Sequence, residues 1–141
     1  MPTYRTASEA ETIALGERLA RELPPGVVLL IGNLGAGKTT LAKGIVSGLG
    51  AAPPEEVASP TFTLIHEYGA GRVYHVDLYR LEEPREVERL GLEELLETSA
   101  LVLIEWGERF PRLWPPERTE IRIRAVGDDA RVIEVVPSTH A

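Results

Sequence analysis

The 141-residue sequence contains no cysteine and no glutamine, and Asn33 is its only asparagine. The absence of cysteine excludes disulfide bonds and metal sites built on thiolates. Leucine follows Asn33, so the Asn-Lys-x-Asp motif with which many GTPases recognise guanine is missing. A water-positioning glutamine of the kind found in Ras is missing as well. These absences argue against a standard GTPase.

Long apolar runs and excess positive charge are also lacking. No apolar stretch approaches the length of a membrane span and the N-terminus lacks a signal-peptide pattern, so we expect a cytoplasmic location. The net charge of −7 makes the chain a poor candidate for gripping a nucleic-acid backbone unaided. The length predicts one domain over residues 1–137, followed by a frayed tail over residues 138–141.

A glycine-rich loop, IGNLGAGKTT, occupies residues 31–40. It fits the pattern G-x-x-x-x-G-K-[ST], which begins at Gly32 and ends at Thr39. Glycine lets backbone N–H groups approach phosphate oxygens, while Lys38 would reach the β and γ phosphates and the Thr39 hydroxyl would bind Mg²⁺. The pattern therefore predicts a nucleotide site, and the missing guanine motif favours adenine.

The residues on both sides of this loop have the patterns that such a site requires. Residues 27–31 form a continuous apolar run, as expected of a strand buried on both faces. After the loop, apolar residues recur at helical spacing from Leu41 to Leu49, and Gly50 suits a C-terminal cap. A strand, a glycine loop and a helix thus follow one another in the required order.

The rest of the chain alternates between strands and helices. A capping box at Ser8 and Glu11 predicts a helix that ends before Pro24, and Pro84 predicts a short helix that Gly91 divides. The remaining expected strands are residues 61–68 and 72–79, paired as a hairpin, then residues 100–104, 120–126 and 132–136. The sequence therefore predicts an α/β fold, a P-loop NTPase-type three-layer sandwich with a mixed, partly parallel sheet and a C-terminal antiparallel hairpin.

Two acids stand at predicted strand ends, where phosphate-loop enzymes place their catalytic carboxylates. Glu105 follows four apolar residues in LVLIEW, and Asp77 lies near the end of the strand in RVYHVDLYR. We expect both acids and Lys38 to be catalytic, with Glu105 beside the magnesium held by Thr39 and with Asp77 orienting the attacking water or coupling to the switch loop. The alternative for each acid is a solvated carboxylate at a strand end.

Two further features have a functional and an ordinary interpretation. Ser59, Pro60, Thr61 and Phe62 form a short, proline-stiffened segment that presents a hydroxyl, as switch segments that sense a γ-phosphate do. The alternative is an ordinary turn into a strand. Trp106 would pack near the nucleotide or contact a partner, and its alternative is core packing.

Four motifs follow one another in the order G-x-L-G-A-G-K-T-T, S-P-T-F-T-L, H-x-D-L-Y-R and L-I-E-W. In this combination the chain resembles the TsaE family of small bacterial ATPases, also called YjeE, over residues 11–136. Asn33 departs from the family pattern, which often has an acid there, and Gly107 stands where proline often follows the tryptophan. Neither departure touches a catalytic position.

The resemblance implies a role in forming threonylcarbamoyladenosine, the modified adenosine next to the anticodon in tRNAs that read codons beginning with A. It implies the TsaD–TsaB pair as partner, with tRNA reached only through that pair and with no part for DNA or membranes. TsaD would transfer the group from an adenylate made by TsaC. This chain would bind ATP and Mg²⁺ and hydrolyse the ATP, weakly when alone, in support of that cycle.

The resemblance also assigns roles to individual residues. Thr39 and Glu105 match the magnesium positions, Asp77 matches the acid of the aspartate motif, and Trp106 matches the tryptophan beside the nucleotide. The segment from Ser59 to Phe62 matches the switch. The residues that match the ATP-binding loop are Gly32, Gly35, Ala36, Gly37, Lys38, Thr39 and Thr40.

Two other functions stay open at this point. A small-molecule kinase would need an acceptor pocket and usually an arginine-bearing lid, and the sequence has no obvious lid insertion. A nucleotide-binding assembly factor that does not hydrolyse ATP would not need both Asp77 and Glu105.

Overall fold

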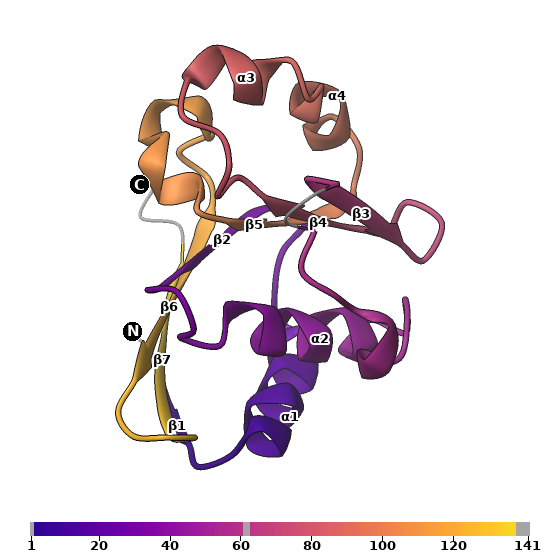
Figure 1. Cartoon of the computed structure of the whole chain (residues 1–141). Coiled ribbons are helices and arrows are strands. Elements are labelled where there is room, and N and C mark those ends of the chain that lie inside the picture. Colours follow the sequence, from indigo (N-terminus) through magenta and orange to yellow (C-terminus); the bar gives the residue numbers. More distant parts are fainter. Residues whose placement is uncertain (1, 61–62, 138–141) are drawn as a thin grey trace.

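A seven-stranded sheet forms the middle layer of the protein (Figure 1). The computed structural model describes residues 2–60 and 63–137. The sheet order is β1-β7-β6-β2-β5-β4-β3, with β2 parallel to β5 and β6, β4 parallel to β5, and the other pairs antiparallel. The strands are β1 (Thr3–Thr6), β2 (Gly26–Ile31), β3 (Ile65–Tyr68), β4 (Val73–Asp77), β5 (Leu101–Glu105), β6 (Thr119–Ala125) and β7 (Arg131–Val136).

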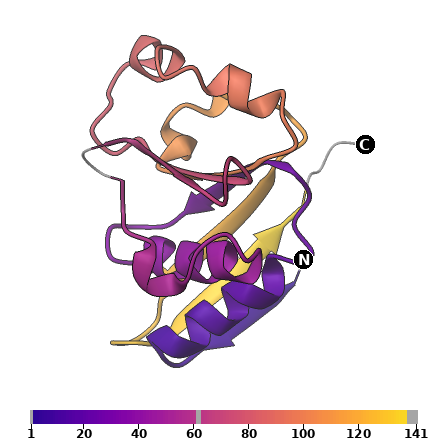
Figure 2. The same cartoon turned by 90° about the vertical axis from the view of Figure 1, so that its right-hand side faces the viewer.

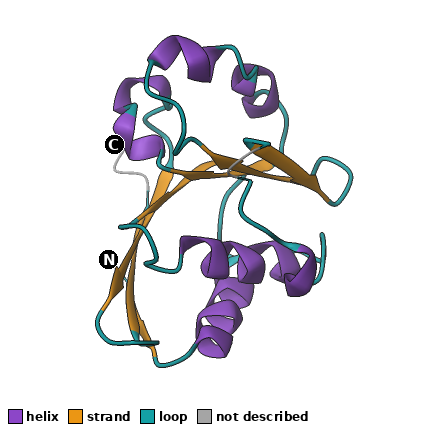
Figure 3. Cartoon of the chain, viewed as in Figure 1, coloured by secondary structure: helices purple, strands orange, loops and turns teal. Residues whose placement is uncertain are grey.

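Helices cover both faces of this sheet (Figures 1 and 3). One face carries α1 (Glu9–Leu19) and α2 (Lys38–Gly48), and the other carries α3 (Pro84–Glu88) and α4 (Leu92–Leu96). The short 3-10 helices are η1 (Pro54–Glu56), η2 (Gly107–Arg109) and η3 (Pro111–Leu113). The three layers, the mixed sheet and the antiparallel β6–β7 hairpin confirm the predicted fold class. Within the described part of the chain, none of the helices has the length and apolar content needed to span a bilayer.

The central strand β2 is buried on both faces, as its apolar run predicts. Val28 and Leu30 belong to the core beneath α1 and α2, whereas Val27 and Leu29 belong to the core on the opposite face. Because successive side chains of a strand point to opposite faces, a strand in the middle layer must be apolar at every position.

Glycines bring α1 and α2 unusually close together, and Figure 2 shows the two helices side by side. A Cβ added to Gly44 would lie 2.1 Å from the carbonyl oxygen of Ile13, and one added to Gly16 would lie 2.6 Å from that of Leu41. No side chain fits at such distances, so the glycines set how closely α1 and α2 pack.

Several element boundaries agree with the sequence and others do not. Ser8 caps α1 by accepting a hydrogen bond from the Glu11 amide, and Gly50 follows α2 with a φ of +70°. However, α1 ends at Leu19, several residues before Pro24, and the edge strand β1 was not predicted. The predicted tail, residues 138–141, lies outside the described residues.

Candidate active site

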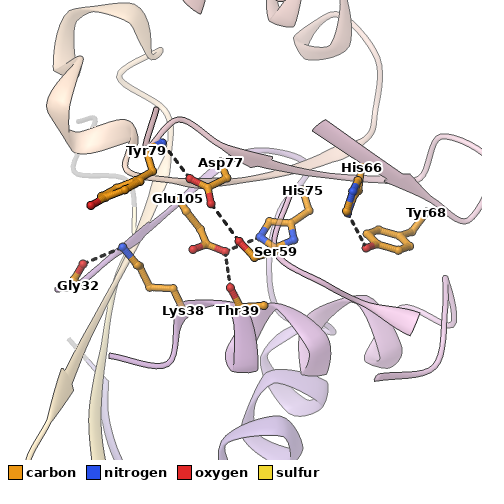
Figure 4. A network of polar contacts seen from close by, with 10 residues as sticks. All are labelled: Gly32, Lys38, Thr39, Ser59, His66, Tyr68, His75, Asp77, Tyr79 and Glu105. Carbon is orange, nitrogen blue, oxygen red and sulfur yellow. Dashed lines mark hydrogen bonds and ion pairs between the residues drawn. The ribbon is translucent and has the colours of Figure 1, made fainter. Parts of the chain in front are cut away.

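The side chains of the candidate site meet at the carboxyl ends of β4 and β5 (Figure 4). Asp77 and Glu105 are paired in register as the last residues of these two parallel strands. Leu103, two residues before Glu105, belongs to the core beneath α1 and α2, so the alternation of β5 turns Glu105 to that same face. Both acids are almost fully buried, with exposed fractions of 3% for Asp77 and 4% for Glu105.

The phosphate loop joins β2 to α2 directly below these acids. Gly35 has a φ of +80° and Gly37 a φ of +105°, in the left-handed region that glycine tolerates best. Gly37 is the N-cap of α2 and leaves the first amides of the helix without a capping side chain. Such amides, together with the positive end of the helix, are suited to binding an anion.

Glu105 accepts two side-chain hydrogen bonds through Oε2. Thr39 Oγ1 donates to it over 3.0 Å from the first turn of α2, and His75 Nε2 contacts it at 2.6 Å. The His75 ring is fully buried, and its Nδ1 has no hydrogen-bond partner within the described chain. This arrangement fits an imidazole that carries its proton on Nε2 and donates it to the carboxylate. His75 therefore fixes the direction of Glu105 towards Thr39.

The pair of Thr39 and Glu105 has the geometry of two neighbouring ligands of Mg²⁺. Two oxygens at right angles in an octahedral site, each about 2.1 Å from the metal, lie about 3 Å apart. The Oγ1 and Oε2 atoms are 3.0 Å apart. Among residues 2–60 and 63–137 there is no cluster of three or more His, Cys, Asp or Glu side chains that would hold a metal alone. The site thus suits Mg²⁺ that also takes phosphate oxygens and water as ligands.

Asp77 connects β4 to the segment predicted as a switch. Its Oδ2 accepts a hydrogen bond from Ser59 Oγ over 3.0 Å, and its Oδ1 accepts one from the Tyr79 amide over 2.9 Å. Pro60 is buried, and its carbonyl accepts a 2.6 Å hydrogen bond from the Leu64 amide. Thr61 and Phe62, the other two residues of the predicted switch, lie outside the described residues.

Lys38 is buried between the loop and Trp106. Its Nζ donates to the carbonyl of Gly32 over 2.8 Å and lies 3.4 Å from the centre of the Trp106 ring. Burial lowers the pKa of Lys38, and the nearby carboxylates of Glu105, Glu108 and Asp77 act in the opposite direction. Lys38 is thus a poorly hydrated cation, held by a carbonyl and an aromatic face until an anion approaches it.

Trp106 reaches Lys38 because its backbone is in the left-handed region, with a φ of +66°. A non-glycine residue adopts this conformation rarely, and at the end of a buried strand it turns the ring back over the loop. Tyr79 packs beside the ring, with the two ring centres 5.2 Å apart. Trp106 is partly buried and also packs against the core on the α3 and α4 face, so it combines core packing with a contact to Lys38.

One cavity of about 370 Å³ brings most of the predicted residues together. Of the predicted set, Gly35, Gly37, Lys38, Thr39, Thr40, Ser59, Asp77, Glu105 and Trp106 line it. Gly32 is packed closely against β6, where an added Cβ would lie 2.6 Å from the carbonyl oxygen of Ile123. Ala36 does not line the cavity, and its carbonyl accepts a hydrogen bond from Arg131.

Sequence reasoning missed several members of this neighbourhood. Tyr79 and Arg131 line the cavity, and Glu108 lies close enough to Lys38 to affect its pKa. Burial raises the pKa of Glu108, and its Oε1 is buried without a partner within the described residues. His75 is the first residue of the motif H-x-D-L-Y-R and stands two positions before Asp77 on the same strand, but neither signal identified its contact with Glu105.

The comparisons with known proteins agree with one another. The family model described as "Threonylcarbamoyl adenosine biosynthesis protein TsaE" matches residues 6–133. A Bacillus subtilis (strain 168) protein named "tRNA threonylcarbamoyladenosine biosynthesis protein TsaE" is 44% identical over 133 residues, covering 92% of this chain and 82% of the relative. A Haemophilus influenzae protein of the same name is 43% identical over 116 residues, covering 81% of this chain and 72% of the relative.

A solved structure has the same fold. It is the crystal structure of YdiB from Bacillus subtilis, which is similar with a TM-score of 0.76 and 36% sequence identity. The match covers 97% of this chain and 85% of that chain. With the phosphate loop, the two buried acids and the matched length taken together, the chain belongs to the TsaE family.

Proposed function

We propose that this protein binds ATP with Mg²⁺, hydrolyses it, and thereby supports threonylcarbamoyladenosine formation in tRNA. The observation that carries the proposal is the hydrogen-bonded set of Thr39, Glu105 and His75 beside the phosphate loop. A hydroxyl and a buried carboxylate in this position are the usual protein ligands of a nucleotide-bound magnesium ion.

The phosphates of ATP would occupy the cavity above the phosphate loop. The amides at the start of α2 would bind the β-phosphate, and Lys38 would exchange its present partners for the β and γ phosphates. That exchange is favourable because the Gly32 carbonyl and the Trp106 ring carry no full charge. The nucleoside would extend towards a smaller hollow beside the start of α1, lined by Glu9, Thr12, Gly37, Thr40, Asp129 and Arg131.

Hydrolysis requires a water molecule in line with the bond that breaks. In that step the water oxygen would bond to the γ-phosphorus while the bond to the ADP oxygen breaks, and a bound Mg²⁺ would supply positive charge that stabilises the phosphate oxygens. Thr39 and Glu105 would hold the ion, and His75 would keep Glu105 in place. Asp77 faces the same cavity and would orient the water and accept its proton.

The contact between Asp77 and Ser59 would make the site sensitive to the γ-phosphate. Ser59 donates to Asp77 in this structure, and a water bound to Asp77 would compete for that carboxylate. Hydrolysis would therefore alter the segment that begins at Ser59, and a protein partner would read the difference. From the family resemblance we infer that the partner is the TsaD–TsaB pair, with tRNA reached through it. The net charge of −7 suits protein docking better than direct tRNA binding.

The test combines three measurements on the purified chain. ATP and GTP binding are titrated with and without Mg²⁺, ATP hydrolysis is followed with and without the TsaD–TsaB pair, and tRNA modification is assayed in the same mixtures. We expect ATP to bind more tightly than GTP, and the pair to accelerate hydrolysis. Lys38→Ala should abolish productive ATP binding. Unchanged Mg²⁺-ATP affinity in that variant would refute the site, and phosphorylation of a small metabolite would favour a kinase instead.

A further inference from the structure

Arg131, the first residue of β7, lines the cavity and contacts the backbone of the phosphate loop. Its Nε donates to the carbonyl of Ala36 over 2.8 Å, and its Nη2 lies 3.5 Å from the carbonyl oxygen of Gly35. A Cβ added to Gly37 would lie 3.4 Å from the same Nε. The guanidinium therefore packs against three consecutive residues of the loop, Gly35 to Gly37. Arg131 follows Ala36 by 95 positions in the sequence.

The other side of the guanidinium holds the turn between β6 and β7. Nη1 donates to the carbonyls of Ala130 over 2.9 Å, Asp128 over 3.2 Å and Gly127 over 3.3 Å. Arginine has five donors in one rigid plane, and here each of its three nitrogens contacts a backbone carbonyl. Arg131 thus joins two backbone segments, and its donors are directed at carbonyls of the loop and the turn.

The direction of these carbonyls matters for a phosphate site. A loop binds phosphate when successive N–H groups point inwards, which requires its carbonyls to point outwards. Outward carbonyls lose their solvent where another element covers them, so they need a donor there. Arg131 supplies that donor for Ala36, which is buried, and it makes a longer, exposed contact with the carbonyl of Gly35. Its positive charge strengthens the contact with Ala36.

We propose that Arg131 is a positioning residue which holds the phosphate loop in its nucleotide-binding shape from the C-terminal hairpin. This inference rests on the proposed nucleotide binding at the same loop. Arg131 lines the cavity, but all three of its nitrogens already donate to backbone carbonyls, so it acts through the loop. It orients the loop amides, and those amides bind the β-phosphate that ADP and ATP share. Losing Arg131 should therefore weaken both nucleotides alike, whereas losing a contact to the γ-phosphate would weaken ATP alone.

The experiment titrates ADP and ATP, each with Mg²⁺, into the wild type, Arg131→Ala, Arg131→Lys and Arg131→Gln. Arg124→Ala is the control, because Arg124 is an exposed residue of the same hairpin and its loss changes the net charge equally. We expect Arg131→Ala to bind both nucleotides at least about tenfold more weakly, the effect of losing a charged hydrogen bond. Arg131→Lys should recover little, since an ammonium group cannot bridge two segments as the planar fork does.

Three results would overturn the inference: full recovery in Arg131→Lys, a loss no larger than that of Arg124→Ala, or a much larger loss for ATP than for ADP. If Arg131→Ala does not fold, the Lys and Gln variants decide. Amide hydrogen exchange without nucleotide is a second readout, in which the amides of residues 36–38 should exchange faster in Arg131→Lys than in the wild type. This readout does not need a ligand, so it tests Arg131 even if the wild type binds no nucleotide and the proposed function fails.

Discussion

Two regions that pack against α2 differ in what holds them together. At the start of the helix, Lys38 and Thr39 meet Glu105, Asp77 and the buried ring of His75. Along its length, α2 meets α1 through glycines whose added Cβ atoms would clash with backbone. The first region is held by buried charges and hydrogen bonds, and the second is held by the close packing of two helix backbones.

The start of α2 thus serves nucleotide binding, whereas the glycine contact along its length serves stability. The close fit of the two helix backbones fixes the glycine contact. In the polar region, the charged side chain of Lys38 is buried beside an aromatic ring and a carbonyl. Burying a charge without an ion-pair partner costs folding free energy. Substitutions in the polar region should therefore change nucleotide chemistry, and substitutions in the glycine contact should change the free energy of unfolding.

The largest effect is expected for Asp77→Asn. The amide keeps the shape of the side chain but cannot accept a proton from water, so hydrolysis should fall by about 10²–10⁴-fold while ATP affinity stays nearly unchanged. Steady-state ATP hydrolysis with partners and equilibrium titration measure the two quantities. Asp128→Asn, the same change on an exposed turn, is the control. Normal hydrolysis in Asp77→Asn would make Asp77 a structural residue.

Gly44→Ala should have the next largest effect, and on stability alone. The added methyl group would lie 2.1 Å from the Ile13 carbonyl oxygen, so α1 must move away from α2 at a cost of about 1–3 kcal/mol in unfolding free energy. Urea denaturation measures this cost. Gly127→Ala is the matched control, since its added Cβ meets only the Ala130 side chain at 3.6 Å. Equal stability of the two variants would contradict the close packing described for this contact.

Glu105→Ala should weaken Mg²⁺-ATP by about tenfold and leave metal-free ATP nearly unchanged, because the carboxylate binds through the ion. His75→Phe should show a smaller effect with the same Mg²⁺ dependence, since it removes the hydrogen bond that orients Glu105. Titrations with and without Mg²⁺ separate the two cases, and Glu93→Ala on the surface of α4 is the control. An equal loss without Mg²⁺ would assign Glu105 to the nucleotide itself.

The smallest effects come from two glutamates whose pKa values move in opposite directions. Burial raises the pKa of Glu108 above its usual value of 4.5, so ionising this side chain lowers the free energy of unfolding as pH rises. Glu108→Gln should therefore be more stable than the wild type at pH 7, and the difference should vanish below pH 4.5. Backbone hydrogen bonds from Glu83 and Glu82 lower the pKa of Glu86, so Glu86→Gln should lose stability at pH 7. That loss should shrink as pH falls below 4.5. Melting temperatures against pH measure both, and shifts of the same sign would contradict the assignment.

The sequence predicted the fold well where the pattern of side chains is local. The apolar run of β2, the cap at Ser8 and the break at Gly91 all lie where expected. The strand β1 has only four residues, two of them exposed, and it forms because β7 offers a free edge for antiparallel pairing. Nothing in those four residues alone distinguishes a strand from a loop.

The same division applies to the candidate site. The phosphate loop and the acid after an apolar strand are local patterns, so Lys38, Thr39, Asp77 and Glu105 were predicted from them. The contact of Arg131 with Ala36 joins residues 95 positions apart, and that of His75 with Glu105 joins residues 30 apart. Such contacts depend on sheet order and register, which a single strand does not specify.

By itself, the sequence determined the class of this protein: a phosphate loop between a buried strand and a helix, with acids at strand ends. Those features follow from the conformational freedom of glycine and the alternation of side chains along a strand, which need no distant partner. Only the tertiary structure decided that β4 and β5 are neighbours in register, which places both acids and His75 above Thr39. It also decided that β7 returns beside the loop, because pairing between distant strands is settled by the burial of the whole sheet.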